Sequence, residues 1–289
     1  MERELFTIIT RAVHSLPGAC TAPPKCQYTD ACIVLTLLWA VVHDRPVDWA
    51  CRRRNWPWHD RTRRLPSGAT MSRRLRTDSV RDLLLATLER LNIVPEPHQR
   101  LILDGKALAI AWHSADPDAK VGRGAGGLAK GYKLHMIVDE TGNLVSFLVT
   151  ALNVGEQQAA RTMIESIDHG RGTQMLADSN YDSSALYDAA ASKGVQLIAD
   201  KRYKKAKGLG HHYQSPHRLK ALAMMQADHT VLDPRRRIEG CFGTLGNVTG
   251  GLCGLPNWVR RIDRVERWIA AKLMIDAAHR RLRRGHAVA

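Results

Sequence analysis

The order of strand-like and helical segments after residue 100 constrains the fold of this chain most. Residues 100–112, RLILDGKALAIAW, read as a strand interrupted by a tight turn, and residues 131–153 read as a hairpin that turns at residues 139–143. Two helical segments then alternate with two strands, the short buried TQMLAD and VQLIADKR. Three strands followed by alternating helices and strands predict an α/β domain, with a mixed sheet flanked by helices.

The first 98 residues show helical patterns and little that reads as strand. Residues 2–15, 29–43 and 77–92 have apolar residues at helical spacing, and PSGATMSRRLR at residues 66–76 reads as a loop, a capping residue and a short basic helix. VPEPHQ at residues 94–99 interrupts this pattern. We therefore predict an all-α region over residues 1–98 and the α/β domain over residues 99–289, which ends in a helix that begins near Trp258.

Positive charge is concentrated near the N-terminus. The chain has 43 Lys and Arg against 28 Asp and Glu, a formal charge of +15 and a sequence pI near 9.9. Ten arginines lie between Arg45 and Arg76, interleaved with Trp49, Trp56 and Trp58. Such a segment could be a solvated face with core tryptophans, but arginines among indoles are better explained by contact with a DNA backbone. We predict that residues 1–98 bind DNA, and a helix-turn-helix would fit this region although no recognition helix stands out in the sequence.

Three carboxylates stand where a functional site could form. Asp104 precedes Gly105, Asp178 ends an apolar strand, and Glu239 lies on a helix four residues after Arg235. Asp104 alone would be an ordinary turn residue, and Glu239 alone could form a weak surface ion pair with Arg235, worth about 0.5 kcal/mol. Together they offer hard oxygen ligands for one or two Mg²⁺ or Mn²⁺ ions, which activate an attacking oxygen and stabilise a leaving oxygen in phosphodiester chemistry.

Other features of the sequence could suggest further or different sites, and each has a simpler explanation. Asp200 rivals Asp178, because it also lies near the end of an apolar strand, whereas Asp182 is expected to cap or begin the next helix. GRGAGG at residues 122–127 has the spacing of a dinucleotide fingerprint but lacks the strand before it and the helix after it, so we predict a flexible loop near the site. No CxxC pair occurs among the six cysteines, and the histidines around His211 lack acids at ligand spacing, which argues against zinc.

Four motifs in order resemble the DDE transposases of bacterial insertion sequences. These motifs are LDGK around Asp104, KGYKLHMIVDETG, LADSNYDS around Asp178 and RRRIEGCFGTL around Glu239, and PSGATMSRRLR also resembles the segment upstream in such proteins. The resemblance covers roughly residues 100–280. It implies a ribonuclease H-like fold and an acidic triad of Asp104, Asp178 and Glu239, and it favours Asp178 over Asp200.

The resemblance also implies an activity and partners. Such enzymes use Mg²⁺ or Mn²⁺, as two ions, to cleave DNA at the ends of the element and to join the freed 3′-hydroxyl to target DNA. The partners would be double-stranded DNA and further copies of this chain, as a dimer or higher assembly that holds two ends. Residues expected to bind phosphate or DNA are Arg52, Arg53, Arg54, Arg73, Arg74, Lys130, Lys201, Arg202, Arg235 and Arg236.

The match departs from the family pattern beside Glu239. Related enzymes often carry a tyrosine seven residues before the glutamate and a lysine seven residues after it, and here these positions hold Leu232 and Gly246. Alternative functions are a catalytically inactive DNA-binding descendant of a transposase, or a ribonuclease H-like nuclease that cuts without joining. No signal peptide or bilayer-length apolar run is apparent, so we expect a cytoplasmic, nucleoid-associated bacterial protein without a membrane partner.

Overall fold

Two compact units make up the chain. The computed structural model describes residues 2–57, 64–92, 100–167, 173–201, 214–247, 251–252 and 254–285. The first unit combines Met1–Ile93 with Thr244–Ala289, and the second is Val94–Gly243. This division differs from the predicted domains, because residues 244–289 group with the N-terminal helices rather than with the α/β domain. The reason is helix α10 (Ile262–Arg283), which buries most of its residues and contacts α1, α2 and α5.

The described residues of the first unit form helices. Helix α2 (Asp30–Val42) is buried over almost its whole length, and the Thr29 hydroxyl caps it by accepting a hydrogen bond from the Cys32 amide at 3.1 Å. Ser67 caps helix α4 (Gly68–Arg74) by accepting a hydrogen bond from the Thr70 amide, and it is the cap expected from PSGATMSRRLR. Helix α10 begins at Ile262, four residues later than predicted. The other helical elements are α1 (Glu2–His14), α3 (Val47–Ala50), η1 (Arg53–Asn55) and α5 (Asp78–Leu91).

Two tryptophans of the basic N-terminal segment belong to the core of this unit. Trp56 is 2% exposed and stacks on Trp39, with ring centroids 4.9 Å apart, while Phe6 meets both rings edge-on. Trp49 is half-buried against the same cluster. The prediction that these indoles contact DNA is therefore wrong for Trp56, whose ring packs with its neighbours to stabilise the fold. Trp58 lies outside the described residues.

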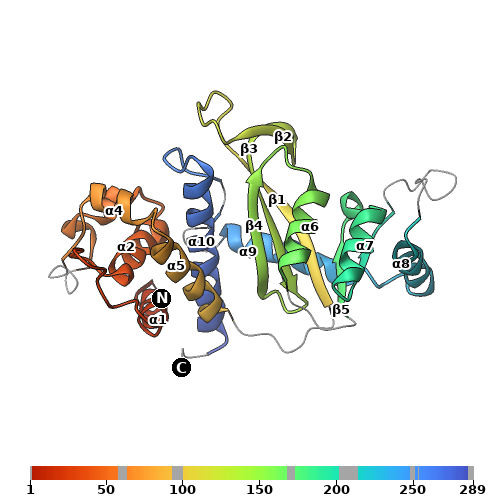
Figure 1. Cartoon of the computed structure of the whole chain (residues 1–289), viewed down its shortest axis with the longest axis horizontal. Coiled ribbons are helices and arrows are strands. Elements are labelled where there is room, and N and C mark those ends of the chain that lie inside the picture. Colours follow the sequence, from red (N-terminus) through yellow and green to blue (C-terminus); the bar gives the residue numbers. More distant parts are fainter. Residues whose placement is uncertain are drawn as a thin grey trace. The chain divides into compact units, whose positions relative to one another are not determined.

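A six-stranded mixed sheet forms the centre of the second unit (Figure 1). Strand β3 (Gly127–Asp139) pairs antiparallel with β1 (Arg100–Ala109), β2 (Lys120–Gly124) and β4 (Leu144–Ala151). Strands β5 (Thr173–Ala177) and β6 (Val195–Ala199) continue the sheet beyond β1, and both run parallel to it. The predicted mixed sheet is thus present, with the antiparallel strands first along the chain and two parallel ones after them.

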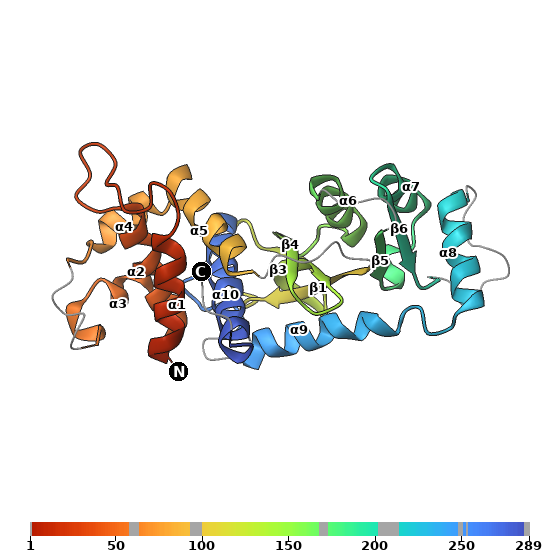
Figure 2. The ribbon, with the colours of Figure 1, turned by 90° about the horizontal axis from the view of Figure 1, so that it is seen from below.

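Helices cover both faces of this sheet. Helices α6 (Glu156–Ser166) and α7 (Ser184–Ser192) pack on one face, and α9 (Arg236–Asn247) runs along the other, as Figure 2 shows. Helix α8 (Pro216–Ala227) packs against β6 and α7. The short helices η3 (Ser179–Tyr181) and η4 (Asp233–Arg235) follow β5 and precede α9, respectively. The apolar face predicted around Glu239 is buried, since Ile238 and Phe242 are nearly inaccessible.

Two sequence interpretations in this unit are wrong. Strand β1 runs without a turn through Asp104 and Gly105, so Asp104 lies within a strand rather than at its end. A side chain at Gly105 would approach Lys133 Cδ and His135 Nδ1 to 3.2 and 3.3 Å, which explains a glycine that resembles a turn residue. GRGAGG is the end of β2 and the turn into β3, not a loop, and Gly122 admits the Leu152 carbonyl, which a Cβ would meet at 2.2 Å.

Candidate active site

The sheet register brings Asp104 and Asp178 together. Strands β1 and β5 run parallel, with Ile102 beside Leu176. Continued by two residues, this register sets Asp104 beside Asp178, on strands that are about 4.8 Å apart. The charge of Asp178 contributes to a raised pKa of Asp104, after the larger effect of burial. Two of the three predicted acids therefore lie side by side.

Helix α9 covers the face of the sheet to which Asp104 points. Leu103 and its antiparallel partner Ile137 point into the core beneath α6 and α7, so Asp104 points to the opposite face. Lys106, on the same face as Asp104, has its ammonium 5.9 Å from the centroid of the Phe242 ring of α9. Asp104 therefore opens toward the helix that carries the third predicted acid.

Burial disfavours the ionised form of Asp104. Desolvation raises its pKa to about 6, against the lowering effect of the Gly105 amide, which donates to Oδ1 at 2.7 Å. Burial also raises the pKa of Asp178, whose oxygens accept from the Asn180 amide and side chain at 2.9 and 3.1 Å. Arg235 lowers the pKa of both aspartates. A divalent cation would relieve the cost of keeping both groups ionised.

Replacement of Asp104 by asparagine should stabilise the metal-free protein at neutral pH. The folded-state pKa of about 6 lies above the ordinary value of 3.8, so the folded protein binds the extra proton and loses stability as pH rises between these values. We expect Asp104→Asn to raise the free energy of unfolding by about 1–3 kcal/mol at pH 7.5 and to have little effect at pH 3.5. Urea denaturation in EDTA at both pH values measures this, and a gain independent of pH would contradict it.

Glu239 does not join the two aspartates. Its side chain on α9 is 61% exposed and forms an ion pair with Arg235 at 3.7 Å. It is also not among the charges with the largest effects on the pKa of Asp104 or Asp178. Among the described residues, no three His, Cys, Asp or Glu side chains lie close enough to hold a metal ion. Of the three carboxylates expected to converge, only Asp104 and Asp178 lie together. Arg235 pairs with Glu239 and also acts on the two aspartates.

Sequence reasoning missed Glu156, whose charge acts on both aspartates. It is the first residue of α6, and its charge raises the pKa of both Asp104 and Asp178. Lys133 of β3 donates to Glu156 Oε1 at 2.6 Å, and both side chains are largely buried. An acid at the first position of a helix is common because it complements the helix dipole, so the sequence offers no signal that marks Glu156.

The hydroxyl of Tyr181 is buried near these carboxylates. Tyr181 ends the short helix that follows Asp178, is fully buried, and its hydroxyl has no hydrogen-bond partner within the described ranges. Burial raises its pKa, as do the neighbouring charges of Glu156, Asp104 and Asp178, so the group stays protonated and can donate. A buried donor without an acceptor destabilises a protein by about 1–3 kcal/mol.

Removal of this hydroxyl should therefore stabilise the protein. We expect Tyr181→Phe to raise the free energy of unfolding by about 1 kcal/mol in urea denaturation without metal. Tyr187 provides a matched control, since it is equally buried but its hydroxyl hydrogen-bonds to the Ala199 backbone at 3.2 Å. Tyr187→Phe should lower the free energy of unfolding by a similar amount, and equal signs for the two variants would show that the Tyr181 hydroxyl is satisfied.

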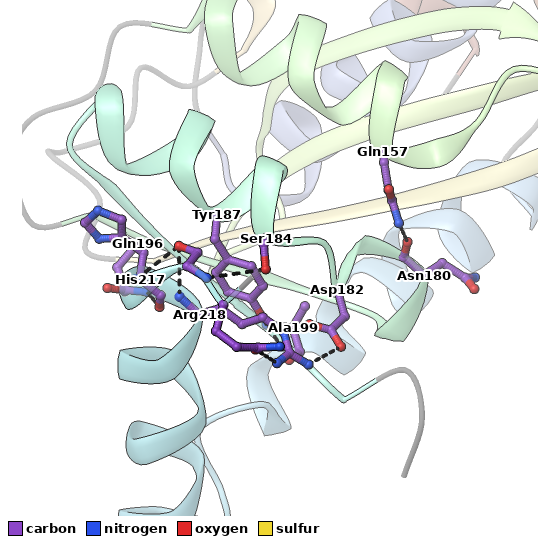
Figure 3. A network of polar contacts seen from close by, with 11 residues as sticks. Gln157, Asn180, Asp182, Ser184, Tyr187, Gln196, Ala199, His217 and Arg218 are labelled. Atoms are coloured by element: carbon purple, nitrogen blue, oxygen red, sulfur yellow. Dashed lines mark hydrogen bonds and ion pairs between the residues drawn. The ribbon is translucent and has the colours of Figure 1, made fainter. Parts of the chain in front are cut away.

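A buried ion pair holds the segment that follows Asp178. Arg218 of α8 donates from Nε and Nη2 to the two carboxylate oxygens of Asp182 at 2.6 and 2.8 Å, and both side chains are almost fully buried (Figure 3). Asp182 was expected to cap or begin the next helix, but Ser183 holds the N-cap position of α7 and the helix begins at Ser184. The prediction is wrong because the Asp182 carboxylate pairs with the Arg218 guanidinium. The two residues are far apart in the sequence, so no local pattern indicates this pair.

The residues predicted to bind DNA fall into different environments. Arg52, Arg53, Arg54 and Arg73 are exposed in the helical unit. Arg74 is instead buried, pairs with Asp30 and donates to the Tyr28 carbonyl at 2.9 Å, so we correct its predicted role to a structural one. In the second unit, Arg236 is exposed and Arg235 half-buried, Lys201 is half-buried, and Lys130 donates to the Ser114 carbonyl at 2.5 Å. Arg202 and His211 lie outside the described residues.

Comparison with protein families decides what kind of domain contains this site. A family described as "Transposase DDE domain" matches residues 112–250. The chain carries a transposase DDE domain. Asp178 and Glu239 lie within the matched segment, and Asp104 lies eight residues before it. The resemblance to DDE transposases, drawn from the four motifs, is thereby confirmed.

Other comparisons add little to the DDE domain match. No curated protein shows significant sequence similarity to the chain. A cryo-EM structure of the piggyBac transposase synaptic complex with hairpin DNA superposes with a TM-score of 0.49 and 10% identity, covering 99% of this chain and 74% of that one. Likeness at this level supports no statement about function. No helix in the described part of the chain is long and apolar enough to cross a membrane.

Proposed function

We propose that this chain is a bacterial insertion-sequence transposase with a ribonuclease H-like catalytic domain. It would cleave DNA at the ends of its element and join the freed 3′-hydroxyl to target DNA. The observation that carries this proposal is the pair Asp104 and Asp178, placed side by side by parallel strands in a chain with a transposase DDE domain. The order of antiparallel strands followed by two parallel strands supports the proposed fold.

The residues of the site fit a divalent metal ion. The side chains that meet at the aspartate pair offer carboxylate oxygens, the ligands that Mg²⁺ and Mn²⁺ prefer. Burial leaves these carboxylates poorly solvated and raises the pKa of Asp104, so a cation would gain by binding there. When bound, a pair of such ions supplies activation of the attacking oxygen and stabilisation of the leaving oxygen.

The protein side chains would then hold and neutralise the DNA backbone. Asp104 and Asp178 hold the metal, and Arg235, which lowers the pKa of both, lies where it can bind a phosphate oxygen. The family resemblance assigns Glu239 as the third acid, and the ion pair with Arg235 links it to the aspartates. Cleavage would use water as the nucleophile, and joining would use the 3′-hydroxyl that cleavage releases.

The helical unit would contribute DNA binding. Arg52, Arg53 and Arg54 lie at or next to η1 and are exposed, as phosphate-binding residues must be. We expect their joint replacement by glutamine to weaken binding to all duplexes alike. The slope of log K against log salt should fall by about one unit for each phosphate that the protein no longer neutralises.

Fluorescence anisotropy over a salt series measures both the affinity and the slope. Replacement of the exposed Arg161 by glutamine is the control, because this arginine lies on α6 in the other unit. An unchanged slope in the triple variant would exclude these arginines from the interface.

A second candidate function is a DNA-binding protein that has lost catalysis. It is favoured by the exposed position of Glu239 and by Leu232 and Gly246 at positions where related enzymes often carry tyrosine and lysine. The same chain would then bind DNA, as a dimer or higher assembly on two element ends, without cutting it.

Metal-dependent nicking and joining of labelled DNA separates the candidates. The substrate is a duplex that carries the inverted repeats flanking the gene, incubated with wild-type protein in Mg²⁺, Mn²⁺ or EDTA. The proposed function predicts nicks at the repeat ends and joined products in either metal but not in EDTA. Binding without nicks would support the inactive descendant, and nicks without joined products would support a nuclease.

A further inference from the structure

Strand β2 and the start of β3 form a two-stranded arm at one end of the sheet, residues 120–131, which we call the β2–β3 arm (Figure 1). The antiparallel register leaves only Ala125 and Gly126 for the turn between the strands. Residues 127–129 pair with β2 and with no other described strand, since β1 and β4 pair with β3 only from Gly131 onwards. The arm therefore extends beyond the main body of the sheet as a ribbon of two strands.

Buried contacts fix the base of the β2–β3 arm. The Tyr132 hydroxyl donates to Asp116 Oδ2 at 2.7 Å, and both side chains are buried, so the segment that enters the arm is tied to the strand that leaves it. Gly122 lies so close to the backbone after β4 that a Cβ there would meet the Leu152 carbonyl oxygen at 2.2 Å. A ribbon held in this way presents its side chains in a fixed orientation.

One face of the arm carries exposed apolar and basic side chains. Val121 pairs with Lys130, and Arg123 pairs with Leu128. Because paired residues of antiparallel strands point to the same face, these four side chains lie together. Leu128 is 75% exposed and Val121 46%, and Arg123 is exposed with no ion-pair partner among the described residues. Apolar side chains that remain this exposed beside a free cation indicate an interaction surface.

The charge of the arm selects the partner. Residues 119–138 contain no Asp or Glu, and the arm itself carries Lys120, Arg123 and Lys130. A second copy of the same arm would bring like charges together, whereas a polyanion is attracted to them. The major groove of B-DNA is about 12 Å wide and admits a two-stranded β-ribbon. Glycine and alanine occupy most other positions of the arm, which keeps the ribbon narrow.

We propose that the β2–β3 arm is a DNA-binding ribbon that enters the major groove of the duplex on which the chain acts. Arg123 binds a phosphate at the edge of the groove, and Leu128 makes apolar contact with base edges such as the thymine methyl group. The inference rests on the proposed function for the identity of the duplex. It adds a contact surface in the second unit to the exposed arginines of the helical unit.

Two variants of the arm have matched controls elsewhere in the same unit. Arg123→Gln is compared with Arg161→Gln on α6, where the arginine is also exposed. Leu128→Ser is compared with Leu219→Ser on α8, where the leucine is 42% exposed. All four substitutions are at the surface, so each variant is expected to fold, and circular dichroism checks this.

Fluorescence anisotropy with the labelled repeat duplex over a salt series measures binding. We expect Arg123→Gln to raise the Kd at least about threefold and to lower the slope of log K against log salt by about one unit. Leu128→Ser should raise the Kd by about threefold or more and leave the slope unchanged, because it removes no charge. Both control variants should bind like wild type.

Dimethyl sulfate footprinting tests which groove the arm enters. The reagent methylates guanine N7, which lies in the major groove, and adenine N3, which lies in the minor groove. Wild type should protect guanine N7 positions that become reactive again in Leu128→Ser. A footprint that does not differ between the two proteins, or one in which only adenine N3 protection is lost, would overturn the major-groove ribbon.

Binding by wild type separates failure of this inference from failure of the proposed function. If wild type binds the repeat duplex and both arm variants bind it equally well, the arm is not a DNA contact and the proposed function stands. If wild type does not bind the duplex, both are refuted. If the arm variants bind DNA like wild type but lose self-association in sedimentation, the arm is an interface between copies of this chain instead.

Discussion

Asp178→Asn is expected to lower the rate of metal-dependent nicking at least about 1000-fold while DNA binding stays within about twofold of wild type. The amide keeps the size of the side chain and its position beside Asn180 but removes the charge that would hold the metal beside Asp104. Nicking of the labelled repeat duplex in Mn²⁺, together with an anisotropy assay of binding, measures the two effects separately.

Asp200→Asn is the matched control for this loss. Strands β5 and β6 pair with Ala177 beside Ala199, so Asp178 and Asp200 follow the ends of adjacent parallel strands. Asp200 acts on the buried hydroxyl of Tyr187, and it is not among the main charges on Asp178. Asp200→Asn should therefore nick DNA like wild type. Loss of nicking in Asp200→Asn with full activity in Asp178→Asn would exchange the roles of the two residues.

Asp182→Ala is expected to lower the free energy of unfolding by about 3–5 kcal/mol. The substitution leaves the Arg218 guanidinium fully buried without its carboxylate partner, although Nη1 still donates to Gln214 Oε1 at 2.8 Å. Desolvation of an unpaired cation is costly, whereas removal of both charges is often tolerated. Urea denaturation followed by circular dichroism measures the loss of stability.

Two further variants test the physical reason for this loss. Asp182→Ala combined with Arg218→Met removes the stranded charge, and it should recover part of the lost stability. Arg161→Ala removes an ion pair with Glu165 in which both side chains are more than half exposed, and it should cost less than about 1 kcal/mol. Equal losses in Asp182→Ala and Arg161→Ala would contradict the account of burial.

Much of the fold could be predicted from periodicity. The hairpin of β3 and β4, the helices α5, α6 and α7, and the strands β5 and β6 have the expected types and positions, because apolar spacing and turn residues agree there. The prediction of a turn at Asp104 and Gly105 was wrong. An Asp-Gly pair is typical of a turn, but here the glycine leaves room for Lys133 and His135 of β3. Local chemistry does not reveal a neighbouring strand.

Contacts between distant segments account for what sequence patterns missed. The final helix α10 groups with the first unit because its buried residues contact α1, α2 and α5, and no local signal indicates which helices an apolar face meets. Arg74 has the sequence surroundings of any other arginine in the basic segment, and only its ion pair with Asp30 distinguishes it. Glu156 was overlooked for the same reason, since Lys133 and Asp178 come from other elements.

The proposed function depends most on a metal centre formed by Asp104 and Asp178. The most direct test is the anomalous scattering of Mn²⁺ in crystals of the full chain grown with MnCl₂. The account predicts an anomalous peak within about 2.5 Å of carboxylate oxygens of both aspartates. A peak bound elsewhere, or Mn²⁺ absent from this pair at concentrations that support nicking, would contradict it.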